Sequence, residues 1–375
     1  MSYLCQAVSE PVEVDSETWS VPERPRLTRD VKGGGNEAMK RVVADHFGGP
    51  DVLHVVEEPV PRPGPGQVRV EVEAAGVSFT DALLRAGTYL GGPKPPFTPG
   101  YELVGRVREV GKGRQTLSEG DRVAALTVWG GYAEQVCVPG ELAVPVPDDL
   151  DAALLVSIIF PYLTAYQLLH RAARARRGET VLLHGAAGRV GTAVLELAAP
   201  AGLRVYGTAS ADECAKVERL GAVAIDYRDE DFLPRVRELT GGGVDVALDG
   251  IGGTLSLRSF RALRPGGRLV VFGHYVTLAH GRKSRRGWLT WYASTAAVAL
   301  AGLLSPRRRV LSYRIAKLRD RHPDWFRADL QELVRLLRAG VVNPEVAQRL
   351  PLTEARQAHE LLNTSAAKGK LVLVP

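Results

Sequence analysis

The feature that most restricts the fold is a glycine-rich turn between an apolar run and a helical pattern. Residues 181–184 read Val-Leu-Leu-His, and residues 185–191 read Gly-Ala-Ala-Gly-Arg-Val-Gly. Small residues let the backbone approach a pyrophosphate, and a helix that begins there offers it unpaired N–H groups. This context favours a dinucleotide-binding loop over a structural turn. The expected cofactor contacts are Ala187, Gly188, Arg189, Val190 and Gly191, with a solvent-facing position as the equal alternative for Arg189.

Strand and helix patterns alternate from about residue 165 onward. Ser210, with Glu213 three residues later, has the sequence of a capping box at a helix start. Such alternation predicts a parallel sheet with right-handed crossovers. The expected strands are residues 180–184, 203–208, 223–226, 244–249 and 268–273, and the expected helices are residues 190–199 and 212–220.

The part before this alternation, residues 40–160, is β-rich. Short apolar runs are separated by glycine and proline, as in the stiff turn at residues 61–66. We therefore expect a rolled sheet or partly open barrel there, and an α/β chain of about two domains in 375 residues. Amphipathic helices are expected at residues 324–339 and 353–363, and a last strand at residues 370–375.

The N-terminal residues and the cysteines bear on location. Residues 1–38 are polar and predict a flexible extension without a secretory signal, with Met39 as a hypothetical start of the native chain. Three widely separated cysteines exclude a disulfide framework and a four-cysteine zinc lobe. A reducing, cytoplasmic location is therefore expected.

Charge and hydropathy leave three partner classes to weigh. The net charge of +6 invites a nucleic-acid or membrane partner, but the basic runs are scattered, which favours a solvated surface. Residues 288–304 carry no charge, yet are just short of a membrane span and contain polar residues. We expect a buried or subunit-interface helix, with membrane spanning, membrane contact or substrate lining as alternatives.

The end of the second expected strand bears on the choice of dinucleotide. An acid there would hydrogen-bond the ribose 2′-OH and select NAD, but Ala209 and Ser210 occupy that position and Asp212 comes later. Without the acid nothing repels a 2′-phosphate, so NADPH is favoured. Tyr227 and Arg228, after the next strand, are candidates to face that phosphate.

From about residue 39 to 375 the chain resembles the zinc-independent quinone oxidoreductase branch of the medium-chain dehydrogenase/reductases. This branch includes zeta-crystallin-like quinone reductases, polyketide enoyl reductases and synaptic-vesicle membrane-protein homologues, the last being closest through residues 207–210 and the apolar insert. The likeness is carried, in order, by FGGPDVL (47–53), SFTD (78–81), GTY (87–89), PGYELVG (99–105), GDRV (120–123), LTAY (163–166), the loop AAGRVG (186–191), IDY (225–227), DGIGG (249–253) and GKLVL (369–373).

The resemblance implies a GroES-like β-rich substrate domain over residues 39–160, completed by residues 304–375. A Rossmann domain over residues 161–303 is inserted between these two segments, and homodimers are common in the family. The resemblance also implies further cofactor contacts at Thr164, Thr208, Ser210, Tyr227, Gly250, Phe272, Gly273 and Lys368 or Lys370.

Two positions carry the implied catalysis. Tyr89 aligns with the family's substrate-site tyrosine and is expected to donate a proton or bind the oxyanion, with an aromatic pocket wall as the alternative. Ser78 stands where relatives usually have asparagine, so a hydroxyl replaces a two-ended amide. Glu213 and Cys214 stand where relatives often place a basic residue, which weakens the preference for NADPH.

Zinc relatives have Gly-His-Glu where this chain has Gly100-Tyr101-Glu102, so no metal site is expected. Without a Lewis acid the acceptor must already be polarised, such as a quinone or an α,β-unsaturated carbonyl. The expected function is NADPH-dependent hydride transfer to it. The alternatives are an enoyl-thioester reductase, with residues 282–286 holding a pantetheine phosphate, and a membrane-associated or RNA-binding relative with little turnover.

Overall fold

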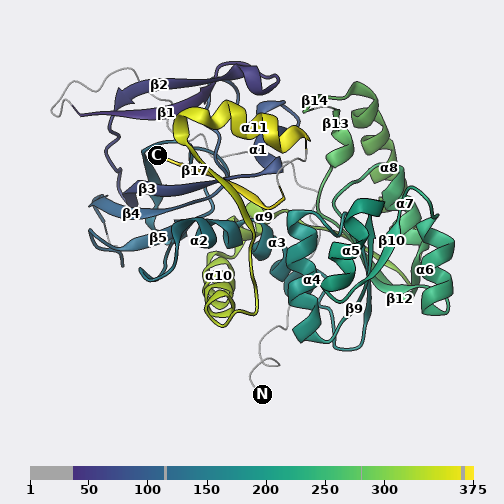
Figure 1. The fold of residues 1–375 in the computed structure, drawn as a ribbon. Coiled ribbons are helices and arrows are strands. Elements are labelled where there is room, and N and C mark those ends of the chain that lie inside the picture. Colours follow the sequence, from purple (N-terminus) through teal and green to yellow (C-terminus); the bar gives the residue numbers. More distant parts are fainter. Residues whose placement is uncertain (1–36, 114–115, 280, 365–367) are drawn as a thin grey trace. The chain divides into compact units, whose positions relative to one another are not determined.

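The structure, a computed structural model, describes residues 37–113, 116–279, 281–364 and 368–375. These residues form two large sheets, one β-rich and mixed, the other parallel and flanked by helices (Figure 1). The predicted extension over residues 1–38 lies outside this range except for its last two residues. The first strand, β1, begins at Ala38.

The β-rich lobe is built on the long strand β3 (Gln67–Val77), along which buried and half-buried side chains alternate. β3 pairs antiparallel with β4, β6 and β17, and β17 comes back to it from the other end of the chain (Figure 1). The elements of this lobe are β1 (Ala38–Ala44), β2 (Leu53–Pro59), α1 (Phe79–Arg85), β4 (Leu103–Val110), β5 (Arg122–Ala125), β6 (Gln135–Pro139), β7 (Ala143–Pro145), β16 (Val346–Pro351), α11 (Ala355–Thr364) and β17 (Lys370–Val374).

The second sheet has the strand order β10-β9-β8-β11-β12-β15, with every neighbouring pair parallel. This order confirms the predicted doubly wound α/β domain beside a β-rich one. Strand order reverses at β8 (Thr180–His184), and doubly wound sheets bind ligands at the carboxyl ends beside such a switch point. The other strands are β9 (Arg204–Ala209), β10 (Val223–Asp226), β11 (Val244–Asp249), β12 (Leu263–Val271) and β15 (Arg309–Ser312).

Helices connect these strands and the two lobes. Within the parallel domain they are α4 (Arg189–Ala201), α5 (Ala211–Arg219), α6 (Phe232–Thr240), α7 (Thr254–Arg261) and α8 (Arg285–Leu304). The remaining elements are α2 (Ala152–Ile159), α3 (Pro161–Gln167), α9 (Ile315–Arg321), α10 (Pro323–Arg338) and the short strands β13 (Leu278–Ala279) and β14 (Arg282–Lys283). The helices α1, α2, α3, α6, α7 and α9 were not predicted. α2 and α3 are buried on nearly every side, so their apolar residues show no helical period.

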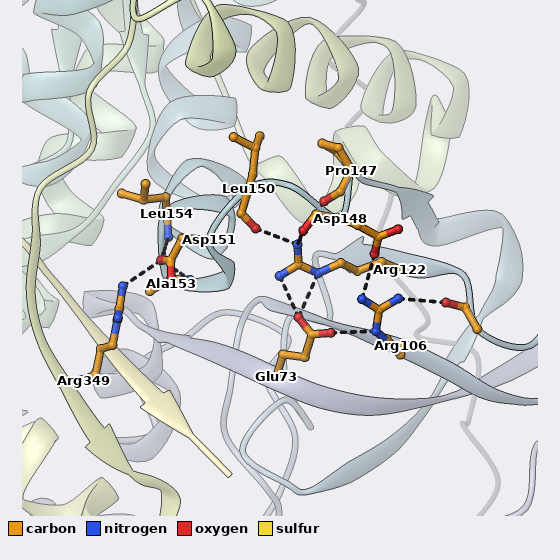
Figure 2. Close-up of polar contacts among 11 residues, drawn as sticks. Glu73, Arg106, Arg122, Pro147, Asp148, Leu150, Asp151, Ala153, Leu154 and Arg349 are labelled. Carbon is orange, nitrogen blue, oxygen red and sulfur yellow. Dashed lines mark hydrogen bonds and ion pairs between the residues drawn. The ribbon is translucent and has the colours of Figure 1, made fainter.

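Arg122 and Arg106 connect the strands of the β-rich lobe to the loop before α2, residues 147–151, through hydrogen bonds and ion pairs (Figure 2). The buried Arg122 donates to Glu73 Oε2 at 2.8 Å and to the carbonyl oxygens of Pro147 and Leu150 at 2.9 and 2.6 Å. Arg106 reaches the same Glu73 carboxylate at 3.3 Å. Because each charge has several partners, this network fixes how the chain enters α2.

Three local expectations need correction. The parallel sheet continues past residue 303, since β15 pairs with β12. Ser210 does precede α5, but its side chain makes no capping hydrogen bond and bonds Asp212 instead. α8 is not buried within the chain: only Gly287, Ser294 and Val298 are buried along its length.

Two apolar stretches of the described chain are long enough to cross a membrane by length and composition, Ala152–Ala172 and Arg285–Leu304. The first is largely buried inside the protein, as a core helix would be, and the second is largely exposed. Apolar residues surround α8 on all sides, so its pattern could not tell which side packs on the protein.

Candidate functional site

The glycine-rich loop connects β8 to α4 at the carboxyl end of the parallel sheet. A Cβ on Gly191 would lie 2.3 Å from the carbonyl oxygen of Gly185, so the first turn of α4 closes on the loop too tightly for a side chain. Gly188 is the N-cap, and no side chain of the described residues caps the helix. The first N–H groups of α4 are therefore left for an anion, beside the buried Ala187 and half-buried Val190.

Arg189 extends from this loop toward the β-rich lobe. Its side chain is half-buried, and its Nε is buried without a hydrogen-bond partner in the described parts of the chain. Burial lowers the pKa of Arg189, while the charge of Glu102 nearby opposes that change. A guanidinium that is not hydrogen-bonded to a carboxylate can bind a pyrophosphate instead. The residues of the loop therefore suit a dinucleotide.

Both threonines that were expected to contact the cofactor, Thr164 and Thr208, are buried. Thr208 is buried, and its Oγ1 lies 3.1 Å from His184 Nδ1 and 3.4 Å from the amide nitrogen of Gly185, which donates to it. Thr208 thus shapes the loop. Thr164 is buried in α3 beside Tyr313.

A charged corner lies at the carboxyl ends of β9 and β10. The hydrogen bond from Ser210 lowers the pKa of Asp212, and the charges of Arg228 and Lys368 act in the same direction. Tyr227 is 55 % exposed, with the Arg228 guanidinium 5.8 Å from its ring centroid. Two cations therefore act on Asp212. Other acids lie close by, since the pKa of Cys214 is raised by burial and also by the charges of Asp226, Asp212 and Glu230.

The carboxyl ends of β11 and β12 approach each other through two glycines. A Cβ on Gly273 would lie 2.3 Å from the carbonyl oxygen of Gly250, and a Cβ on Gly250 would meet the Phe272 ring at 2.8 Å. The resemblance implied these three residues together as cofactor contacts. They form one wall at the carboxyl end of the sheet, where the glycine-rich loop also lies.

The segment after β12 contacts the segment that carries Tyr89. His274 Nε2 lies 3.2 Å from the carbonyl oxygen of Thr88. Tyr275 stacks on Phe79, with ring centroids 4.5 Å apart. Through these contacts, the Gly250–Gly273 wall and Tyr89 belong to one neighbourhood.

Tyr89 has a partner that the sequence did not suggest. Its hydroxyl lies 2.9 Å from the hydroxyl of Tyr101, which is fully buried and packs edge-on against Phe160. Burial raises the pKa of Tyr89 and raises that of Tyr101 well above its usual value. Both phenols stay protonated at neutral pH, so the pair can relay a hydrogen bond but not act as a base.

The structure gives Ser78 a role other than the expected catalytic one. Ser78 is the N-cap of α1, and its hydroxyl donates to Asp81 Oδ2 at 2.8 Å. The amide nitrogen of Asp81 in turn donates to the Ser78 hydroxyl. Since its proton is already donated, Ser78 is not free to polarise a substrate carbonyl.

Lys370 and Glu102 form a buried ion pair between β17 and the start of β4. The second oxygen of Glu102 accepts from the backbone N–H of Phe160 at 2.5 Å. A Cβ on Gly76 would lie 2.5 Å from Glu102, so only glycine leaves room for the pair. Of the two lysines considered, Lys370 is therefore structural and Lys368 lies in the charged corner.

These residues do not fit a catalytic zinc. The imidazole that a ligand triad would need is replaced by Tyr101, whose hydroxyl is bonded to Tyr89. Glu102 is bound by Lys370. No group of three or more His, Cys, Asp or Glu side chains in the described residues could hold a metal ion.

Comparison with known proteins agrees with this geometry. Residues 64–148 match the alcohol dehydrogenase GroES-like domain family, and residues 220–373 match the zinc-binding dehydrogenase family. The rat quinone oxidoreductase is 31% identical over 350 residues, covering 91% of this chain and 99% of that protein. The chain belongs to the quinone oxidoreductase branch of the medium-chain dehydrogenase/reductases.

Two further members of this superfamily show its range. A mouse synaptic vesicle membrane protein VAT-1 homolog is 31% identical, covering 90% of this chain and 84% of its own. The solved Escherichia coli quinone oxidoreductase, in complex with NADPH, is 29% identical and superposes with a TM-score of 0.78 over 90% of this chain and all of its own. The predicted family is therefore confirmed, and the chain is an oxidoreductase of this type.

Proposed function

We propose that this protein is an NADPH-dependent reductase of quinones or other α,β-unsaturated carbonyls. The observation that carries the proposal is the start of α4, where no side chain of the described residues caps the helix and Gly191 lets the loop pack tightly. Arg189 lies beside it, and its buried Nε has no hydrogen-bond partner among the described residues. The E. coli relative solved with NADPH supports the choice of cofactor.

The chain's own residues would hold the cofactor at three points. The N–H groups of α4 and Arg189 bind the pyrophosphate, and Gly250 and Gly273 leave room for the nicotinamide. Arg228 and Lys368, whose charges act on Asp212, are the cations that would bind the 2′-phosphate of NADPH. When bound, NADPH supplies the hydride.

Tyr89 is our candidate for the group that meets the charge formed on the acceptor oxygen. Its hydroxyl donates to that oxygen while accepting from Tyr101, whose burial keeps it protonated. Because no metal fits here, the acceptor must carry its own electron-withdrawing carbonyl. A quinone or enone satisfies this condition, and an unactivated alcohol does not.

An enoyl thioester is the second candidate acceptor. β14 carries Arg282 and Lys283 and lies close to α1, since Arg85 donates to the carbonyl oxygen of Gly281 at 3.2 Å. Arg282 also lies 3.3 Å from Asp51. These cations could bind the phosphate of a pantetheine arm, as the basic run suggested.

Cofactor titrations followed by acceptor assays test both candidates. NADPH and NADH are titrated by nicotinamide fluorescence, and NADPH oxidation is followed with an ortho-quinone, a short enone and a crotonyl thioester. Tight NADPH binding with quinone or enone turnover supports the proposal. Turnover of the thioester alone favours the second candidate, and no binding of either cofactor overturns both.

A further inference from the structure

α8 is an apolar helix whose outer side no other described part of the chain covers. Residues 287–306 contain no charged residue. Leu289, Leu303 and Leu304 are 73 %, 85 % and 74 % exposed. Isolated exposed leucines are common on protein surfaces, but a continuous apolar surface along a helix marks a binding face.

The exposed residues form one stripe along α8. Leu289, Tyr292, Leu300 and Leu303 recur at helical spacing and are all exposed. The opposite side, with the buried Ser294 and Val298, packs against the protein, where α7 and β15 are neighbours of α8. At about 1.5 Å per residue, the stripe from Leu289 to Leu303 is about 21 Å long, within a 20-residue helix of about 30 Å.

The charge around this stripe has one sign. Residues 250–319 contain fourteen lysines and arginines and no aspartate or glutamate. Arg285 and Arg286 lie in the first turn of α8, and residues 307–309 follow its end. Neither Arg285, Arg286 nor Arg307 has an ion-pair partner within the described ranges, so both ends of the stripe present free positive charge.

This charge distribution argues against α8 of a second copy of the chain as the occupant. If α8 packed antiparallel on itself, Arg285 and Arg286 would face residues 307–309 of the other copy. If it packed parallel, each basic cluster would face its own equivalent. Like charges meet in both arrangements, and residues 250–319 offer no acid to separate them.

Aromatic rings gather near the N-terminal end of the stripe. Trp288, Trp291 and Tyr292 contact one another, with ring centroids 4.9 to 5.7 Å apart, and Tyr292 is 54 % exposed. Lys283 lies over the Trp288 ring at 5.0 Å. Tyrosine and tryptophan beside basic residues are favoured at the boundary between lipid headgroups and acyl chains.

We propose that α8 binds peripherally to an anionic lipid bilayer. The stripe lies in the headgroup region parallel to the surface, and the arginines at both ends contact lipid phosphates. α8 does not span the bilayer, because its inner side stays packed on α7. The occupant is thus a lipid surface. Its anionic phosphates complement the basic, acid-free residues 250–319, and its apolar interior complements the exposed leucines of α8.

Vesicle flotation of the full chain tests the proposal. The wild type is mixed with vesicles of phosphatidylglycerol and phosphatidylcholine, or of phosphatidylcholine alone, at low and high salt. We expect binding to the anionic vesicles only, weakened at high salt. Leu303→Glu should reduce the affinity about tenfold or more, and Arg285→Gln with Arg286→Gln should reduce it severalfold.

Val223→Glu is the matched control, because it places the same charge at an exposed apolar residue of β10. It should bind vesicles like the wild type, and every variant should keep the wild-type unfolding temperature. Failure of the wild type to float with anionic vesicles overturns the proposal. So does a dimer in sedimentation that Leu303→Glu dissociates without any vesicle binding, since a second copy would then cover α8.

Discussion

The glycine-rich loop and the Tyr101 neighbourhood lie in different lobes, and they are built differently. The loop is one continuous segment, residues 185–191, between a strand and a helix. The other neighbourhood joins Tyr89, the adjacent residues Tyr101 and Glu102, and Lys370, which come from three separate places in the chain. The pair of Lys370 and Glu102 exists only because β17 returns to β3.

This difference separates two kinds of residue. In the loop, a change should mainly alter cofactor affinity, because the backbone itself makes the site. In the Tyr101 neighbourhood, buried polar groups are hydrogen-bonded to one another. A substitution of one of them should therefore alter stability or turnover. The predictions below test that division, beginning with the largest effect.

Lys370→Met should cost about 3–5 kcal/mol of unfolding free energy, because it leaves Glu102 buried without its partner. Urea denaturation at neutral pH measures this. Lys216→Met is the matched control: its pair with Glu345 is more exposed, so the loss should be below about 1 kcal/mol. Equal losses in the two variants would contradict the role given to the buried pair.

Gly191→Ala should weaken NADPH binding about hundredfold, because its Cβ cannot fit beside the Gly185 carbonyl and the loop must shift. Fluorescence titration measures the change. Gly64→Ala is the control, since its nearest neighbour is the end of the Gln67 side chain at 3.3 Å. Unchanged affinity in Gly191→Ala would show that the loop does not hold the pyrophosphate.

Acid should destabilise the parallel domain through His184. Burial lowers its pKa to about 4, so below its unfolded value near 6.5 only the unfolded chain takes up the proton. Stability is complete above that value and is lost as pH falls toward 4. Between pH 7 and 5 the loss should be about 2 kcal/mol.

Urea denaturation at both pH values, with the wild type and His184→Gln, measures this contribution. The loss should shrink in the variant but not vanish, because burial also lowers the pKa of His359. His54→Gln, an exposed histidine, should behave like the wild type. An unchanged loss in His184→Gln would show that folding does not lower the pKa of His184.

Tyr89→Phe should lower kcat about tenfold, the worth of one hydrogen bond, with little change in NADPH affinity. Steady-state kinetics with the best acceptor measure it. Tyr275→Phe removes the hydroxyl of an exposed ring nearby and should leave kcat unchanged. If both variants keep full activity, Tyr89 is an aromatic wall and not a donor.

Particular residues show how far prediction from the sequence reached. Gly188, Arg189 and Gly191 could be assigned because strand, turn and helix are adjacent in the chain and each has a local pattern. Ser78 was expected to be catalytic, although residues 78–81, Ser-Phe-Thr-Asp, have the local pattern of a capping box, a signal that was overlooked. Tyr101 was noted only as a missing zinc ligand, because its bond to Tyr89 depends on how two segments cross.

The sequence by itself therefore determined the α/β fold, the dinucleotide loop and the family. All three rest on short-range order: periodic apolar residues, turn residues and motifs read along the chain. Tertiary structure alone decided that Lys370 pairs with Glu102, that Thr208 supports the loop and that α8 keeps an apolar side exposed. These outcomes depend on which surfaces meet, and residues far apart in the chain carry no local signal of that.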